Sequence, residues 1–143
     1  MKTVRDDTGT QYLVLKESTR ASLVRDPETG EECYVQNDRL EVVEDDDALH
    51  VAARGIDPEL RQLLVSVHDD RWLGLLVELT ERGPMTASQL LERYHLCESE
   101  LLGLLSELQA GDLVEPVDIA GEQGYRTTDA CQRAVRFLRS PGG

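Results

Sequence analysis

The chain is 143 residues long and 40% hydrophobic, and its 28 Asp and Glu residues against 15 Lys and Arg give a net charge of −13. This length corresponds to one domain, or to one small domain with an appendage. No apolar run reaches the roughly 18 residues that a membrane-spanning helix needs, and the first residues lack the apolar stretch of a secretory signal. We therefore expect a cytoplasmic protein with no membrane partner, whose charge repels nucleic acids at long range.

Residues 1–44 are expected to form a small antiparallel β-meander. Short runs rich in Val, Leu and Tyr alternate with turn-forming residues and cover 11–18, 21–26, 31–36 and 39–44. Pro27 suits the second position of a type I turn, and Gly30 suits the positive φ that closes a hairpin. Alternation along the first run predicts one apolar face and one mixed face.

Residues 45–68 are expected to be an acidic linker followed by connecting helices. Asp47 is placed to cap a short helix that Gly55 ends, and Pro58 opens the next helix at its first position, where a missing N–H does no harm. The second helix has one apolar stripe, formed by Leu60, Leu63, Leu64 and Val67. With Trp72, this stripe is expected to meet a dimer partner or the β-meander.

Residues 69–143 predict three helices, a two-stranded hairpin about Gly121 to Gly124, and a last helix. Asp69 or Asp70 caps the first helix, and Thr86 is spaced from Gln89 as a capping box. The last helix is expected to start after Thr128. The whole chain is therefore α+β, with an N-terminal β-meander followed by helices and a hairpin.

The cysteines favour neither a disulfide framework nor a metal site. Cys33, Cys97 and Cys131 are odd in number and widely spaced, with no CxxC pair. His95 and Cys97 could in principle join Cys131 at a metal, but soft-metal sites usually have four ligands and a tight pair in sequence. We expect small, half-buried thiols, no metal and no cofactor.

The order of helix, helix, helix, hairpin and closing helix resembles the winged helix-turn-helix family across residues 69–139. The matching residues include Leu105, Leu108, Gly111, Leu113 and Val114, followed by "GYRTT" at 124–128. The chain is also similar to small haloarchaeal proteins that join an N-terminal β-rich segment to such a module. The resemblance implies a winged helix-turn-helix domain over 69–143, a recognition helix at 97–110 and binding to DNA, usually as a homodimer.

The charge distribution conflicts with this implication. Residues 96–124 carry seven acids and no base, whereas DNA affinity comes from Lys and Arg that neutralise phosphates. Burial of Leu101, Leu104, Leu105 and Leu108 would turn small residues outward. The excess of Asp and Glu over Lys also resembles the surfaces of extreme halophiles, in which case the acidity reflects the solvent rather than the partner.

Two hypotheses remain open. The first is a DNA-binding transcriptional regulator, and its expected contacts are Ser99, Ser106, Gln109, Arg126, Arg133 and Arg136. The second is a winged-helix protein–protein interaction module without DNA binding, and its expected face is Ser99, Leu102, Gly103, Ser106 and Ala110. No catalytic residues are expected, because the histidines lack metalloenzyme spacing and no glycine-rich phosphate loop joins a strand to a helix.

Overall fold

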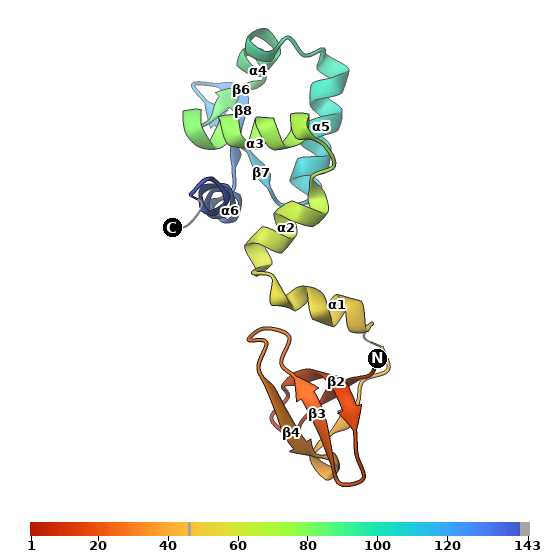
Figure 1. Cartoon of the computed structure of the whole chain (residues 1–143). Helices are drawn as coiled ribbons and strands as arrows, with labels where there is room; N and C mark the ends of the chain where they lie inside the picture. Colours follow the sequence, from red (N-terminus) through yellow and green to blue (C-terminus); the bar gives the residue numbers. More distant parts are fainter. Residues whose placement is uncertain (46, 141–143) are drawn as a thin grey trace. The chain divides into compact units, whose positions relative to one another are not determined.

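The computed structural model describes residues 1–45 and 47–140, and the chain is α+β (Figure 1). It divides into two compact units, Met1–Asp57 and Pro58–Gly143. Each unit has its own hydrophobic cluster. Within the described residues, no helix is long and apolar enough to cross a membrane.

The N-terminal unit contains the expected antiparallel sheet, in the order β4-β3-β2-β1-β5. Its strands are β1 (Thr3–Arg5), β2 (Gln11–Glu17), β3 (Ala21–Arg25), β4 (Glu32–Gln36) and β5 (Glu41–Val42). Strands β1 to β4 follow one another as a meander, but β5 returns across the sheet to pair with β1. Strand β1 was not expected, because three residues carry too little periodicity to be recognised.

The expected alternation along the first run is only partly reflected in burial: one residue on each face of β2, Leu13 or Val14, is buried, and Lys16 and Glu17 at its end are exposed. Val14 packs with Val4, Val24 and Val35 on one face. Leu13 is fully buried on the other, and α1 (Ala48–Ala52) packs against β2. A register shift after Val14 also interrupts the alternation.

Local turn and cap signals in this unit agree with the structure. Gly30 has φ +78°, and its N–H donates to the carbonyl of Asp26 at the turn between β3 and β4. Asp47 caps α1 by accepting a hydrogen bond of 2.7 Å from the N–H of Leu49. A 3-10 turn, η2 (Ala53–Gly55), ends this helical segment, and another, η1 (Asn37–Arg39), precedes β5.

The second unit follows the expected order of helices and hairpin. Its helices are α2 (Pro58–Ser66), α3 (Asp70–Arg82), α4 (Ala87–Tyr94), α5 (Glu98–Ala110) and α6 (Asp129–Arg139). Its strands are β6 (Met85–Thr86), β7 (Val114–Ile119) and β8 (Glu122–Thr127), paired in the order β6-β8-β7. The two-residue strand β6 was not expected; it joins the hairpin to the segment between α3 and α4.

Side-chain caps fix the starts of three helices in this unit. Asp69 accepts hydrogen bonds from two N–H groups at the start of α3. Thr86 and Gln89 form the predicted capping box of α4, and Thr128 caps α6. His95 ends α4 with a left-handed backbone, φ +52°, and so makes the turn into α5.

The hairpin turn lies before the position expected from the glycines. Ala120 and Gly121 both have positive φ, 52° and 85°, whereas Gly124 lies inside β8. A Cβ atom at Gly124 would lie 2.4 Å from a side-chain carbon of Ile119 and 2.8 Å from the carbonyl oxygen of Met85. Gly124 therefore allows strand approach rather than chain reversal.

The core of this unit forms between α3, α4, α5, α6 and the hairpin. Its fully buried members include Leu76, Leu79, Leu90, Leu101, Leu105, Leu108, Leu113 and Cys131. Tyr125 is also buried, as expected for the strand that leaves the hairpin turn. The stripe on α2 is only partly buried: Leu63 lies in the core of this unit, whereas Leu64 is 59% exposed. Its expected contact with a dimer partner or the β-meander stays a prediction.

Candidate functional site: helix α5, the hairpin and helix α6

Helix α5 has a buried side and an outward side, as its leucine spacing predicts. Leu101, Leu105 and Leu108 are buried and Leu104 is half-buried. The outward side exposes Ser99, Leu102, Gly103, Ser106 and Ala110. Gln109 is half-buried, so it is a poorer contact residue than the sequence suggested. Nothing lies within 4 Å of the place where a Cβ of Gly103 would be.

The outward side of α5 is acidic, and neighbouring side chains hold two of its carboxylates. Arg71 of α3 donates to Glu100 at 3.1 Å, and His68 lies 3.8 Å from Glu107. Hydrogen bonds from Cys97 and Arg71 hold the pKa of Glu100 below its ordinary value, so this carboxylate stays charged at neutral pH. The Oγ of Ser99 lies 3.3 Å from the Sγ of Cys97.

Arg126 on the hairpin is held by two carboxylates of the same unit. Its Nη2 lies 2.8 Å from Asp129 at the start of α6, and its Nε lies 3.3 Å from Glu115 on β7. The Nε also donates to the carbonyl oxygen of Thr127. The Nε and Nη2 of this guanidinium therefore already have acceptors inside the unit, and a phosphate would compete with them.

The arginines of α6 differ in their partners. Arg133 reaches Glu59 of α2, with its Nε 2.9 Å from a carboxylate oxygen, and Arg139 reaches Glu81 of α3 at 2.6 Å. These two partners lie on different helices. Arg136 is exposed and makes no ion pair within residues 1–45 and 47–140. A continuous positive strip across the hairpin and α6 is therefore not formed.

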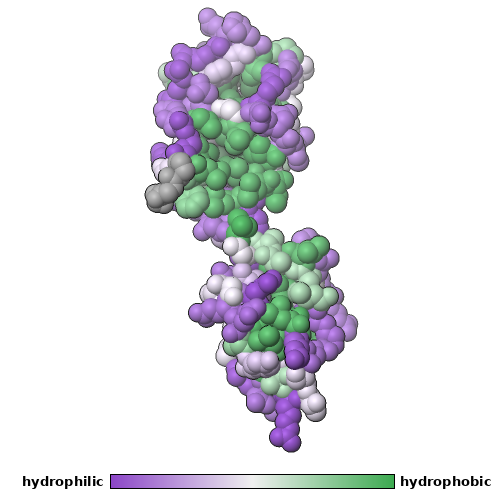
Figure 2. All heavy atoms as spheres, in the orientation of Figure 1, coloured by the Kyte–Doolittle hydropathy of each residue, from purple (hydrophilic) through white to green (hydrophobic). Residues whose placement is uncertain are grey.

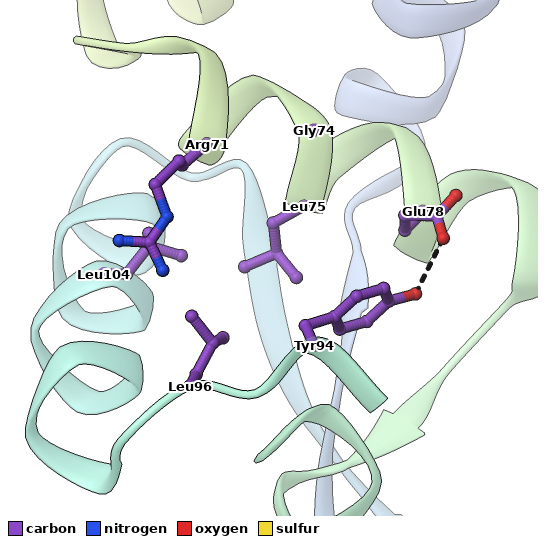
Figure 3. Close-up of a pocket in the computed structure, with 7 residues that line it drawn as sticks. All are labelled: Arg71, Gly74, Leu75, Glu78, Tyr94, Leu96 and Leu104. Atoms are coloured by element: carbon purple, nitrogen blue, oxygen red, sulfur yellow. Dashed lines mark hydrogen bonds between the residues drawn. The ribbon is translucent and has the colours of Figure 1, made fainter. Parts of the chain in front are cut away.

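A small apolar pocket opens between α3 and the segment leading into α5 (Figure 3). Its volume is about 260 Å³, and it is lined by Arg71, Gly74, Leu75, Glu78, Tyr94, Leu96 and Leu104. The hydroxyl of Tyr94 donates to Glu78 at 2.9 Å, which lowers the pKa of Glu78; burial raises the pKa of Tyr94. Both charged groups at this pocket have partners in the chain, and the volume is below the ~300–1,000 Å³ of typical ligand sites.

The cysteines differ from the half-buried thiols that the sequence suggested. Cys33 and Cys97 are exposed, and Cys131 is buried in the core, where burial raises the pKa of its thiol to about 12. No three His, Cys, Asp or Glu side chains gather as metal ligands among residues 1–45 and 47–140.

One surface, formed by apolar side chains on α2, α3 and α6, was anticipated from the sequence only for its α2 part, where Leu64 belongs to the stripe expected to meet a dimer partner or the β-meander. Leu64, Leu73, Phe137 and Leu138 are exposed there, and we call these four residues the apolar face. Phe137 and Leu138 end an amphipathic helix, and no role was expected for them from the sequence. Their adjacency at the C-terminal end of the helix was the signal that could have revealed them.

Comparison with known proteins gives one match. The model of a family of unknown function, DUF7346, covers residues 1–139. The chain belongs to this family. No curated protein and no solved structure matches it. The family model covers both units, so the presence of the sheet and the helical unit in one chain is common to the family.

Proposed function

We propose that the second unit of this DUF7346 protein is a winged-helix module that binds a protein partner rather than DNA. The order α3, α4, α5, hairpin and α6, with β6 paired to the hairpin, supports the winged-helix assignment. We place the protein in the cytoplasm, where unpaired cysteines are kept reduced.

Internal pairing of the arginines is the observation that carries this proposal. Residues 58–140 contain eight arginines, no lysine and fourteen Asp and Glu residues. Carboxylates of the same unit hold five of those arginines, namely Arg71, Arg82, Arg126, Arg133 and Arg139. Since DNA affinity rests on cations free to neutralise phosphates, this surface is poorly suited to a duplex.

The outward side of α5 suits a protein partner. Leu102 is 51% exposed at its centre, and Gly103 beside it leaves room for another backbone to come close. Glu98 and Glu107 flank this centre and are exposed. We infer a partner surface with a hydrophobic groove for Leu102 and positive charges at its rim, because opposite charges at the rim speed association and favour the correct partner.

Substitution of Gly103 tests the proposal without disturbing the core. Tagged full-length chains, wild type and Gly103→Trp, are purified from the native cells, and co-purifying proteins are quantified by mass spectrometry. Gly74→Trp is the matched control, since Gly74 is another helical glycine with open space around its missing Cβ. We expect a protein that is retained by the wild type and Gly74→Trp and at least about tenfold depleted by Gly103→Trp. Identical partners for all three chains would contradict the proposal.

A DNA-binding transcriptional regulator is the second candidate, which the helix order and the unpaired Arg136 favour. On that hypothesis Ser99 and Ser106 face base edges, and binding is weak, salt-sensitive and lost when Arg126→Glu and Arg133→Glu are combined. Fluorescence anisotropy with mixed-sequence duplexes at two KCl concentrations distinguishes the two candidates. We expect no saturable binding; salt-sensitive binding that the double variant loses would establish the regulator instead.

A further inference from the structure

The apolar face is a concentrated patch rather than scattered exposure. Leu64 is 59% exposed, Leu73 36%, Phe137 62% and Leu138 48%, and they come from α6 and the two helices that pack against it, α2 and α3. In Figure 2, hydrophobic side chains gather over the region where Figure 1 places α2, α3 and α6. Single exposed leucines are ordinary, but a contiguous patch marks an interaction site.

The area of the apolar face matches the needs of a standard interface. From their exposed fractions, the four side chains present roughly 400 Å² of apolar surface. A standard interface buries about 800 Å² on each partner, of which a little over half is non-polar.

Charge identifies a second copy of the chain as the occupant. The three helices of the apolar face together carry six arginines against five acids, whereas the rest of residues 58–140 carries two arginines against nine acids. Two copies of a chain with net charge −13 repel one another over most of their surfaces. Two acidic copies can approach each other most closely where their surfaces carry no net negative charge. Helices α2, α3 and α6 provide such a surface.

The three helices also form a fixed platform. Arg133 joins α6 to α2 through Glu59, and Arg139 joins α6 to α3 through Glu81. Cys131, Ala134 and Val135 anchor α6 in the core below. The face is therefore organised before binding, which lowers the entropic cost of association.

We propose that the apolar face is the contact surface of a two-fold symmetric homodimer. In such a dimer the same patch on each copy meets itself, so Phe137 of each copy packs against the apolar face of the other. Phe137 is the expected anchor, because it is the largest exposed side chain of the patch. The outward side of α5 takes no part, so the dimer is independent of the protein partner proposed above.

Sedimentation velocity of the full chain over a range of concentrations tests the dimer. The wild type should shift from the 16.0 kDa monomer toward twice that mass as concentration rises. Phe137→Asp should raise the dissociation constant at least about 30-fold, and Leu138→Asp should act in the same direction. Leu102→Asp is the matched control, since Leu102 on α5 is exposed to the same extent as Leu138, and it should leave the dimer intact.

Salt provides a second measurement that does not depend on any variant. Because an apolar contact between two acidic chains gains from screening, molar KCl should strengthen the dimer rather than weaken it. Circular dichroism melts check that each variant remains folded. A wild type that stays monomeric at all concentrations, or a dimer that Phe137→Asp leaves unchanged, would overturn the proposal. Loss of the protein partner in Gly103→Trp with the dimer intact bears only on the function proposed for α5.

Discussion

Two surfaces of the second unit differ in charge and in apolar exposure although they share one core. Across α5 and the hairpin, residues 96–124 carry seven acids and no base. Helices α2 and α6 instead carry four arginines against two acids and include three of the four residues of the apolar face. If the acidity of the chain were an adaptation to the solvent alone, it would be spread evenly. The scarcity of acids on α2 and α6 indicates a local constraint, and contact with another chain supplies one.

The largest expected effect is the difference in unfolding free energy between substitutions on the buried and the exposed side of α5. Leu108 is fully buried and Leu102 on the same helix is 51% exposed. Leu108→Ala should lower the free energy of unfolding by about 2–5 kcal/mol, because it leaves a cavity in the core, whereas Leu102→Ala should change it by less than about 0.5 kcal/mol. Urea unfolding followed by Trp72 fluorescence measures both. Equal losses would mean that α5 is rotated from the orientation described, and the interaction face would then be wrong.

The next largest difference in stability is expected between alanine substitutions at two glycines, Gly124 and Gly103. At Gly124 an added Cβ meets Ile119 and the carbonyl of Met85, so Gly124→Ala should cost about 1–3 kcal/mol by forcing the hairpin away from β6. At Gly103 the added methyl meets nothing, and Gly103→Ala should stabilise α5 by up to about 1 kcal/mol. Thermal melts of the two variants should therefore move in opposite directions. A stabilised Gly124→Ala would show that the hairpin does not rest on β6 as described.

Features that depend on neighbouring residues in the sequence could be predicted. The capping box of Thr86 and Gln89, the cap at Thr128 and the positive φ of Gly30 are properties of a few consecutive residues. The buried side of α5 followed from helical periodicity for the same reason. The acidity of its outward side was also evident from the sequence, which by itself argued against DNA binding by α5.

Features that depend on distant contacts could not be predicted. The arginine spacing on α6 gave no sign that Arg133 pairs with Glu59, 74 residues away in sequence, or that Arg139 pairs with Glu81. The α2 stripe of Leu60, Leu63, Leu64 and Val67 could be recognised from its spacing, but which of its residues are exposed depends on how α2 packs against α6. Leu13 is buried because α1 covers its face of the sheet, which local alternation cannot show.

A smaller effect, which depends on pH, is expected where α3 faces the turn into α5. The hydrogen bond from Tyr94 lowers the pKa of Glu78 from its ordinary 4.5, so its contribution to stability is present above that value and is lost as pH falls through the lowered pKa. Tyr94→Phe should cost about 1 kcal/mol at neutral pH and almost nothing once Glu78 is protonated. Urea unfolding of both chains between about pH 3 and pH 8 measures the difference. A difference that is independent of pH would show that the hydroxyl acts by packing instead.

The smallest expected effect tests whether internal ion pairs keep this unit from DNA. Glu59→Gln with Glu81→Gln removes the carboxylates that pair with Arg133 and Arg139 and should cost less than about 1 kcal/mol of stability per pair, because these pairs are exposed. The variant should gain weak DNA binding that appears only at low salt, since the two arginines can neutralise at most about two phosphates. Glu28→Gln with Glu31→Gln changes the net charge equally in the N-terminal unit and should gain nothing. If both double variants bind DNA alike, the total charge of the chain, rather than the ion pairs on α6, prevents DNA binding. The charge difference between the two surfaces would then not explain why the unit does not bind DNA.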